Sequence, residues 1–500
     1  MLENIQTAVS LVVQPYVLMV ISLSAIYGLF VGAIPGLTAT MATALLVPIT
    51  FFMEPVPALA AIVTMEAMAI FAGDIPGALV RIPGTPASAA YVEESYALTQ
   101  KGKAGYVLGV DVTVAAIGGL IGSVILIFLA PMLAEVAMQF TCYEYFWLAC
   151  IGLSCAVLVS KKSLVKGLLS LLIGLMMTTV GVDITLGFPR FDFGITDFLN
   201  GFNFIPAMIG MFGVSEVMRN VSSEDIYTKF KVAKTGKIFS GIGKTIRRYK
   251  LNVARSGLIG TFVGVLPGAG ADIAAWICYA ISKKFSKEPQ KFGTGHIEGI
   301  VDAGTANNAG LGGAWVPALV FGIPGDSITA IVIGVLFMKG LRPGPMIFTQ
   351  TPHILYAVYV TFILANLILI PFGFMAIKAG SQMLRVPRNM LMPAILMFCI
   401  VGSFAINNTV FDVGIMLVTG IMAYFMEAND IPVAPAILGL VLGRLVEDNF
   451  MVAMIKSDWN LLHFFYRPVS AVLGIITILL WLSPLFTIWR RSVRRSKQAG

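Results

Sequence analysis

The sequence predicts an all-α polytopic membrane protein built from two inverted-topology repeats, with Pro-Gly-broken helices or re-entrant hairpins and a C-terminal span. Three observations carry this prediction: an apolar composition, four Pro-Gly interruptions inside apolar segments, and motifs that recur in both halves of the chain. Hydrophobic residues make up 57% of the 500 residues and charged residues 12%, whereas soluble domains carry about 25% charge. Apolar runs of roughly 20 residues, long enough to cross a bilayer, recur along the whole length.

The four Pro-Gly interruptions mark the candidate binding region. They are residues 31–40 (VGAIPGLTAT) and 81–90 (RIPGTPASAA) in the first half, and residues 263–272 (VGVLPGAGAD) and 321–330 (FGIPGDSITA) in the second. Pro and Gly break a helix and free backbone groups, which hydrocarbon tolerates only where they line a cavity or meet a ligand. Interrupted helices at matching places in two halves point to the binding site of a transporter. Kinks needed only for packing fit a lone Pro-Gly better than four in register.

The two halves repeat at a nearly constant spacing. Gly32 and Gly264 begin matching motifs whose numbers differ by 264 − 32 = 232, and Pro206 and Pro435 begin another pair that differs by 435 − 206 = 229. The sequence therefore predicts a first membrane repeat over residues 1–218 and a second over residues 251–448. A basic cytoplasmic linker over residues 219–250 joins them, and a C-terminal span with a basic tail occupies residues 449–500, the span itself at about 463–487.

The distribution of basic residues predicts the orientation, because short cytoplasmic loops are enriched in Lys and Arg. The linker and the tail are both basic, so we expect both in the cytoplasm. Counting back through the apolar segments places the loop at Lys161, Lys162 and Lys166 inside, while its counterpart in the second half, Asn407-Asn408, is uncharged and therefore outside. Opposite charge patterns in matching loops predict inverted repeats, a periplasmic N-terminus and a cytoplasmic C-terminus.

The candidate site residues lie at the interruptions, where a helix that restarts presents free N–H groups and a positive dipole end to an anion. Thr85, Ser88 and Ser327 occupy positions where an N-cap hydroxyl is expected, so ordinary capping competes with substrate binding for each of them. The candidate substrate-binding residues are Pro35, Gly36, Thr38, Thr40, Pro83, Gly84, Thr85, Pro86, Ser88, Pro267, Gly268, Gly270, Pro324, Gly325, Asp326 and Ser327.

Polar residues in the second half are candidates for coupling a cation. Exposed carbonyls in broken helices, with Asp and Asn side chains, can coordinate Na⁺. The residues concerned are Asp272, Asn307 and Asn308, although bonding between helices explains the paired Asn nearly as well.

Other charges within apolar segments are functional candidates by default. They are Glu66, Asp74, Arg81 and Asp111. Arg81 is interpreted either as a partner of a carboxylate substrate or, slightly favoured, as the partner of Asp74, because that pairing matches two charges at once. His296 and Glu298 adjoin a polar loop and are expected to be solvated.

Several classes of protein are disfavoured. The net charge of +8 suits cytoplasmic loops of a membrane protein, so no nucleic-acid partner is inferred. The five cysteines show no metal-type or paired spacing. Residues 268–270 resemble a fragment of a phosphate loop, but no Lys-Ser/Thr follows, and no nucleophile-elbow or HExxH pattern supports an enzyme. We therefore expect no cofactor and no bound metal beyond a possible Na⁺.

At these motifs the chain resembles the large membrane subunit of the tripartite tricarboxylate transporter family (TctA-like) over nearly its full length. The resemblance rests on residues 32–40, 81–88 and 264–272, and on Asn307-Asn308 followed by residues 322–326. It departs from the family pattern at Ala303 and Gly304, where Pro and Glu are usual.

The resemblance implies a secondary transporter of the bacterial inner membrane that imports an organic di- or tricarboxylate, driven by a Na⁺ or H⁺ gradient. It also implies two partners, a small membrane subunit (TctB-like) and a periplasmic solute-binding protein (TctC-like) that delivers the carboxylate. The alternative is an ion channel or anion exporter built on the same inverted-repeat scaffold, and a structural assembly protein is a third class. Dependence on a binding protein separates the first two, since a channel needs none.

Overall fold

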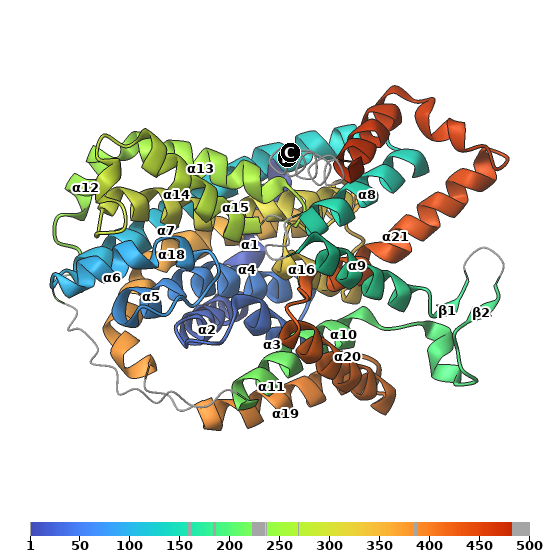
Figure 1. Ribbon diagram of the computed structural model, residues 1–500, viewed down its shortest axis with the longest axis horizontal. Helices are drawn as coiled ribbons and strands as arrows, with labels where there is room; N and C mark the ends of the chain where they lie inside the picture. The colour runs from blue at the N-terminus through green and yellow to red at the C-terminus, as the bar shows by residue number, and fades with distance from the viewer. Residues whose placement is uncertain are drawn as a thin grey trace, which may run out of the picture. The chain divides into compact units, whose positions relative to one another are not determined.

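The computed structural model describes residues 2–158, 163–183, 187–222, 236, 238–268, 270–384 and 388–482, and most of them form helices (Figure 1). Much of the predicted linker, residues 223–235 and 237, lies outside the described residues, as do Lys161, Lys162 and the predicted basic tail from residue 483. The described chain divides into two compact units, and each is discontinuous in sequence: residues 1–135 with 203–429, and residues 136–202 with 430–500.

The larger unit contains the four interruptions. Its elements are α1 (Leu2–Val12), α2 (Pro15–Gly32), α3 (Ala39–Phe51), α4 (Pro55–Ala72), α5 (Asp74–Val80), η1 (Ser88–Ala90), α6 (Val92–Gln100), α7 (Ala104–Ala137, whose last two residues belong to the smaller unit), α10 (Phe204–Ile209), the π-helical η3 (Gly210–Val214), α11 (Ser215–Ser222), α12 (Ile242–Arg248), α13 (Lys250–Val265), α14 (Gly270–Phe285), η4 (Pro289–Lys291), α15 (Ile297–Phe321), α16 (Ser327–Met338), α17 (Ile347–Gln350), α18 (Pro352–Met383), α19 (Arg388–Asn407) and α20 (Val410–Ala428).

The smaller unit is built mainly from three long helices and a β-ribbon. Its elements are α8 (Cys142–Leu158), α9 (Leu164–Thr178), β1 (Gly181–Val182), β2 (Pro189–Arg190), η2 (Thr196–Asn200), α21 (Ala434–Lys456), η5 (Leu461–Phe465) and a last helix over Pro468–Leu482.

Five helical segments of the described chain are long and apolar enough to cross a membrane. They are Pro15–Gly32, Pro55–Val80, Ala104–Ala137, Pro352–Gly380 and Val410–Ala428. The 34 residues of α7 would extend about 51 Å at 1.5 Å per residue, more than the roughly 30 Å hydrocarbon core, so this helix can span the bilayer with a tilt. The prediction of a helical, multi-pass membrane protein is confirmed.

Two details of the predicted fold differ from the structure. The chain is not wholly α-helical, because β1 and β2 pair antiparallel, Gly181 opposite Arg190, and the Asp183 N–H donates to the Phe188 carbonyl at 2.9 Å. Gly187, with φ of 71°, supplies the left-handed residue that this turn needs. The predicted span at about 463–487 is described as the 3₁₀ turn η5 followed by the helix Pro468–Leu482, and residues 483–487 lie outside the described part.

Glycines set the closest helix contacts in the larger unit. Without a side chain, a glycine lets two transmembrane backbones approach directly. A methyl group at any of these glycines would overlap the backbone of the facing helix. The contacts are Gly28–Met65 and Gly32–Ala69 between α2 and α4, and Gly260–Ala306 and Gly264–Gly310 between α13 and α15.

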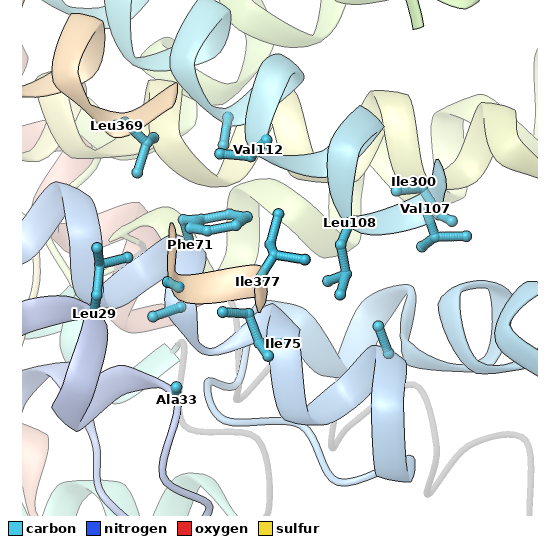
Figure 2. Packing of buried hydrophobic residues seen from close by; sticks show 14 of the residues in the cluster. Leu29, Ala33, Phe71, Ile75, Val107, Leu108, Val112, Ile300, Leu369 and Ile377 are labelled. Carbon is cyan, nitrogen blue, oxygen red and sulfur yellow. The ribbon is translucent and has the colours of Figure 1, made fainter. Parts of the chain in front are cut away.

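A dense apolar cluster joins α2, the α4–α5 segment, α7, α15 and α18 (Figure 2). Phe71 and Ile75 lie at its centre with Val112 of α7 and Ile377 of α18, all of them fully or almost fully buried. Fully burying one such side chain stabilises a soluble fold by about 1.5–3 kcal/mol. Inside a bilayer, tight packing between helices provides the stabilisation instead. This cluster holds the helices that lead into and out of the interruptions.

Two three-part helical bundles complete the protein, one in each unit. In the larger unit, α19 and α20 pack with the segment α10–η3–α11, where the Thr419 hydroxyl donates to the Ala207 carbonyl at 3.2 Å. In the smaller unit, α8 and α9 pack with α21, where the Ser170 hydroxyl donates to the Pro432 carbonyl at 2.5 Å. Each bundle thus combines two consecutive helices with a segment that is distant in the sequence.

Candidate substrate site at four interrupted helices

The first interruption separates α2 from α3. Gly36, with φ of 91°, takes a backbone conformation that side chains disfavour, and it turns the chain at this point. Thr38 then caps α3, because its hydroxyl oxygen accepts the Met41 N–H at 3.1 Å. The turn therefore begins a 13-residue apolar helix with its positive end at Thr38.

The second interruption lies between α5 and α6 and is held by a reciprocal pair of hydrogen bonds. The Thr85 N–H donates to Ser88 Oγ and the Ser88 N–H donates to Thr85 Oγ1, both at 3.1 Å. Both side chains are buried, whereas Pro83 and Pro86 are exposed. Neither residue caps a helix as predicted, because Ala87 occupies the N-cap position of η1; the two hydroxyls stabilise the loop before it instead, and both hydroxyl oxygens are engaged there.

The third interruption follows α13 and opens α14. Gly268 and Gly270, with φ of 78° and 56°, both adopt the left-handed conformation that suits glycine. Asp272 lies in the first turn of α14, where a carboxylate favours the positive end of the helix dipole.

The fourth interruption, between α15 and α16, carries a carboxylate at the cap position. Asp326 caps α16: its Oδ1 accepts the Thr329 N–H at 2.8 Å, and the Asp326 N–H donates to Thr329 Oγ1 at 2.9 Å. The N-cap position predicted for Ser327 is therefore wrong by one residue, because the longer reach of Asp326 lets it cap the helix from the residue before. Ser327 is the first residue of α16 instead.

Contacts of glycines and polar side chains bring the four interruptions together. The Gly84 N–H donates to the Gly73 carbonyl at 2.9 Å, and a methyl group at Gly84 would lie 3.0 Å from the carbonyl oxygen of Gly32. In the second half, a methyl group at Gly270 would lie 2.7 Å from Asp326 Cβ.

Two hydrogen bonds link the second interruption to the helix that opens at the third. Asp272 Oδ1 accepts the Ala87 N–H at 3.1 Å, and the Trp276 indole donates to the Pro86 carbonyl at 3.0 Å. The first turns of α14 thus hold the loop between Thr85 and Ser88. All four predicted interruptions lie in one region of the larger unit.

Arg81 does not pair with Asp74, contrary to the slightly favoured expectation. It ends α5 in the left-handed conformation, with φ of 62°. Its guanidinium instead forms an ion pair with Glu93 at 2.8 Å, and both side chains are more than half exposed. The hydrogen bond to Glu93 raises the pKa of Arg81 further, so the group stays charged.

The paired Asn residues of α15 are buried and only half satisfied. Asn307 Nδ2 donates to the Tyr91 hydroxyl and Asn308 Nδ2 to the Ala67 carbonyl, both at 3.4 Å. Their side-chain oxygens have no hydrogen-bond partner among the described residues. Glu66 of α4 accepts the Trp315 indole N–H at 2.9 Å through one of its two oxygens.

Polar side chains outside the interruptions form contacts that the sequence did not indicate. Glu94 is fully buried and accepts the backbone N–H groups of Gly295 and His296 at 2.8 and 2.7 Å. His296 and Glu298 are not solvated as expected, since Glu298 accepts hydrogen bonds from Asn252 and Ser286 at 3.0 and 2.6 Å. The neighbouring acids Glu93 and Glu94 in an otherwise apolar stretch were the only signal for this contact, and the loop that Glu94 holds belongs to the other half of the chain.

In the described chain, no group of three or more His, Cys, Asp and Glu side chains is arranged to hold a metal ion. What the structure presents is a multi-pass helical membrane protein in which four helices are interrupted at one place, the construction of a secondary transporter. Comparison with known families places it more narrowly: the profile described as "Tripartite tricarboxylate transporter TctA family" matches residues 18–438. The chain belongs to this family. It is the membrane subunit of a tripartite tricarboxylate transporter, and a transport protein rather than an enzyme.

Two similar proteins come from Agrobacterium vitis. The "Uncharacterized 52.8 kDa protein in TAR-I ttuC' 3'region" is 33% identical over 460 residues, which cover 91% of this chain and 91% of that protein. The "Uncharacterized protein in TAR-II ttuC' 3'region" is 36% identical over 228 residues, 45% of this chain and 94% of that protein. No solved structure matches the chain.

Proposed function

We propose that the protein imports an organic di- or tricarboxylate into a bacterial cell, driven by a Na⁺ or H⁺ gradient across the inner membrane. It works with a small membrane subunit and with a periplasmic binding protein that delivers the carboxylate. Its N-terminus lies in the periplasm and its C-terminus in the cytoplasm. The substrate lies between the four interruptions, bounded by the Pro, Gly and hydroxyl residues predicted from the sequence.

The observation that carries this proposal is the meeting of the four interruptions. Three helices of 12 to 16 residues, α3, α14 and α16, begin there. The first N–H groups of a helix lack partners within it, and its positive end favours negative charge. Several such ends in one region suit a substrate with more than one carboxylate.

Equivalent contacts support an origin of the site in two repeats. Gly28, Gly32 and Gly84 of the first half face Met65, Ala69 and Gly73. The corresponding Gly260, Gly264 and Gly325 of the second half face Ala306, Gly310 and Ala314, at a constant offset along the chain. The numbers of the first two glycine pairs differ by 260 − 28 = 264 − 32 = 232, whereas 306 − 65, 310 − 69, 314 − 73 and 325 − 84 all equal 241. A single insertion between the two sets of contacts, of length 241 − 232 = 9, accounts for both values.

The helix ends at the interruptions follow the same offset of 241. Thr85 with Ser88, and Asp326 with Thr329, form the same reciprocal pair of hydrogen bonds, since 326 − 85 and 329 − 88 both equal 241. Arg81 and Gly322, for which 322 − 81 = 241, end α5 and α15 in the left-handed conformation, with φ of 62° and 67°. Two halves with matching contacts and opposite topology allow alternating access, in which one part of each repeat moves against the rest.

The two bundles also correspond, because each takes its third segment from the other half. Residues 204–222 of the first half pack with α19 and α20 of the second, and α21 of the second half packs with α8 and α9 of the first. In both bundles a glycine of the third segment approaches a backbone carbonyl, Gly210 at Met416 and Gly439 at Leu171.

The test is uptake of labelled di- and tricarboxylates into proteoliposomes that contain the chain and the small subunit. The assay is run with and without the binding protein, under a Na⁺ gradient and under a H⁺ gradient. We expect uptake that requires the binding protein and one of the gradients. Flux without any gradient would indicate a channel, and outward transport that ignores the binding protein would indicate an exporter.

A further inference from the structure

Four buried oxygen-bearing side chains meet beside the second interruption. They are Asp74 at the start of α5, Tyr91 between η1 and α6, Asp111 of α7 and Asn307 of α15, each between 0 and 4% exposed. The carboxyl of Asp74 interacts with the side chains of Tyr91 and Asp111, and Asn307 Nδ2 donates to the Tyr91 hydroxyl at 3.4 Å. Four separate segments of the larger unit therefore contribute to one cluster, which we call the Asp74–Asp111 cluster.

The surroundings of this cluster are apolar. Ile75 and Val112, which follow the two Asp residues in the sequence, belong to the apolar core (Figure 2), as does Tyr91 itself. Asp111 Oδ1 faces α15, where a methyl group on Gly304 would lie 2.7 Å from it. Gly304 is one helical turn before Asn307, so Asp111 and Asn307 meet on the same face of α15.

Three oxygens of the cluster have no hydrogen-bond donor. They are Oδ1 of Asp74, Oδ1 of Asp111 and Oδ1 of Asn307, and all three are inaccessible to solvent. Within the described part of the chain, no Lys, Arg or His forms an ion pair or hydrogen bond with these residues. A buried carboxylate without a partner is strongly unfavourable, and a buried amide oxygen without a donor is also costly. The cluster therefore lacks a positive charge that can contact several oxygens at once.

We propose that the Asp74–Asp111 cluster binds one Na⁺ ion, which is the coupling ion if the proposed gradient-driven import holds. A proton alone does not complete the cluster, because a protonated carboxyl donates a single hydrogen bond and three acceptors are open. If the two neighbouring carboxyls share one proton, they carry a single negative charge together. One monovalent cation balances that charge, and its hardness suits carboxylate, amide and phenol oxygens.

The equivalent place in the other half shows a different arrangement. Glu66 precedes Asn307 by 307 − 66 = 241, and Trp315 follows Asp74 by the same offset, 315 − 74 = 241. There the Trp315 indole N–H donates to the Glu66 carboxylate at 2.9 Å, so the protein supplies a permanent donor. In the first half, the residue that corresponds to the donor Trp315 is an acid, Asp74. The Asp74–Asp111 cluster therefore lacks the indole donor that Glu66 has, although the second carboxylate oxygen of Glu66 is also without a partner among the described residues.

The position of the cluster connects an ion to the substrate site. Asp74 directly follows Gly73, whose carbonyl accepts the Gly84 N–H at 2.9 Å, and Tyr91 directly follows η1, which begins at Ser88. A Na⁺ ion that contacts Asp74 and Tyr91 holds both ends of the second interruption against α7 and α15. Loss of the ion removes one of the contacts that hold the loop containing Thr85 and Ser88, so ion binding and the shape of the substrate site are linked.

The experiment measures Na⁺ binding by the purified full-length protein, separately from transport. Binding of ²²Na⁺ is measured at equilibrium, and thermal unfolding is followed in NaCl, KCl and choline chloride at equal ionic strength. The variants are D111N and N307A, with E66Q as the matched control, because Glu66 is an equally buried carboxyl outside the cluster. All four proteins are first shown to be monodisperse, so that a loss of binding is not a loss of fold.

We expect saturable ²²Na⁺ binding and a Na⁺-specific rise in Tm for the wild type and E66Q, with the affinity at least tenfold weaker in D111N and N307A. Unchanged Na⁺ affinity in both variants would overturn the proposal. So would a wild type that binds no Na⁺, or that is stabilised equally by K⁺ or choline. Carboxylate uptake driven by H⁺ with no Na⁺ binding would refute this site and leave the proposed import standing. Na⁺ binding without carboxylate uptake would support the site and refute the proposed import.

Discussion

Gly84 is where a single methyl group should test the proposed substrate site most sharply. In G84A the new Cβ would lie 2.7 Å from Gly73 Cα, 2.8 Å from the Gly73 carbonyl oxygen and 3.0 Å from that of Gly32. All three atoms belong to the backbone, so no side chain can rotate to make room. Ordinary contact begins near 3.4 Å, so the loop must move by 3.4 − 2.7 = 0.7 Å away from α4.

The cost of this movement can be bounded. Overpacking a tight interior site costs about 1–3 kcal/mol. If that free energy falls on the conformation that binds substrate, it lowers the population of this conformation by roughly 5- to 150-fold, at 1.4 kcal/mol for each factor of ten. We therefore expect the initial rate of carboxylate uptake to fall about tenfold or more in G84A. The same should hold for G325A, where the added Cβ would lie 2.6 Å from Ala314 Cα.

The assay is initial uptake into proteoliposomes at matched protein density, measured beside G414A. Gly414 lies in α20, where an added Cβ meets no atom within 4 Å, so this control makes the same glycine-to-alanine change without overlap. G414A should transport at the wild-type rate. Wild-type uptake by both G84A and G325A would refute the assignment of the interruptions as the substrate site.

Three further substitutions test the local physics of the site. R81G should keep or raise Tm, because glycine relieves a left-handed cap and only a solvent-exposed ion pair is lost, whereas R81A should lower Tm. Equal Tm values for R81G and R81A would contradict the strain argument. D326A should lower the free energy of unfolding by about 0.5–2 kcal/mol through loss of the α16 cap. D326N should lower it little, since Asn also caps well, and thermal unfolding of both variants tests this difference. W315F should cost about 1–3 kcal/mol by leaving Glu66 without its donor, and a much smaller cost in thermal unfolding would mean that Glu66 is satisfied in another way.

The sequence was most informative where the backbone itself dictates structure. Proline and glycine cannot continue an apolar helix, so the interruptions at Pro35, Pro83, Pro267 and Pro324 were predicted, and each separates two helical segments in the structure. The hydroxyls of Thr85 and Ser88 were expected at a cap because short polar side chains reach free N–H groups within the same turn, and in the structure they do so in the loop before η1 rather than at its N-cap.

Pairings between distant residues were beyond the reach of the sequence. The choice between Asp74 and Glu93 as the partner of Arg81 depends on the left-handed φ of Arg81, which nothing in the residue type predicts. The bond from Ala87 to Asp272 joins residues 185 positions apart, and local spacing says nothing about it. The Asp74–Asp111 cluster was visible only as separate charges in apolar segments, because its four members come from four different segments.

The exchange of segments between the bundles bears on how the chain matures in the membrane. After α9 ends at Thr178, synthesis must advance by 434 − 178 = 256 before α21 begins at Ala434. At about 5–20 residues per second the wait is roughly 13–50 s. Residues 204–222 likewise wait for α19 and α20. Neither half can complete its own bundle, so the ribosome must release nearly the whole polypeptide before either bundle closes, and a prematurely terminated chain would present unfinished helices to the quality-control proteases of the membrane.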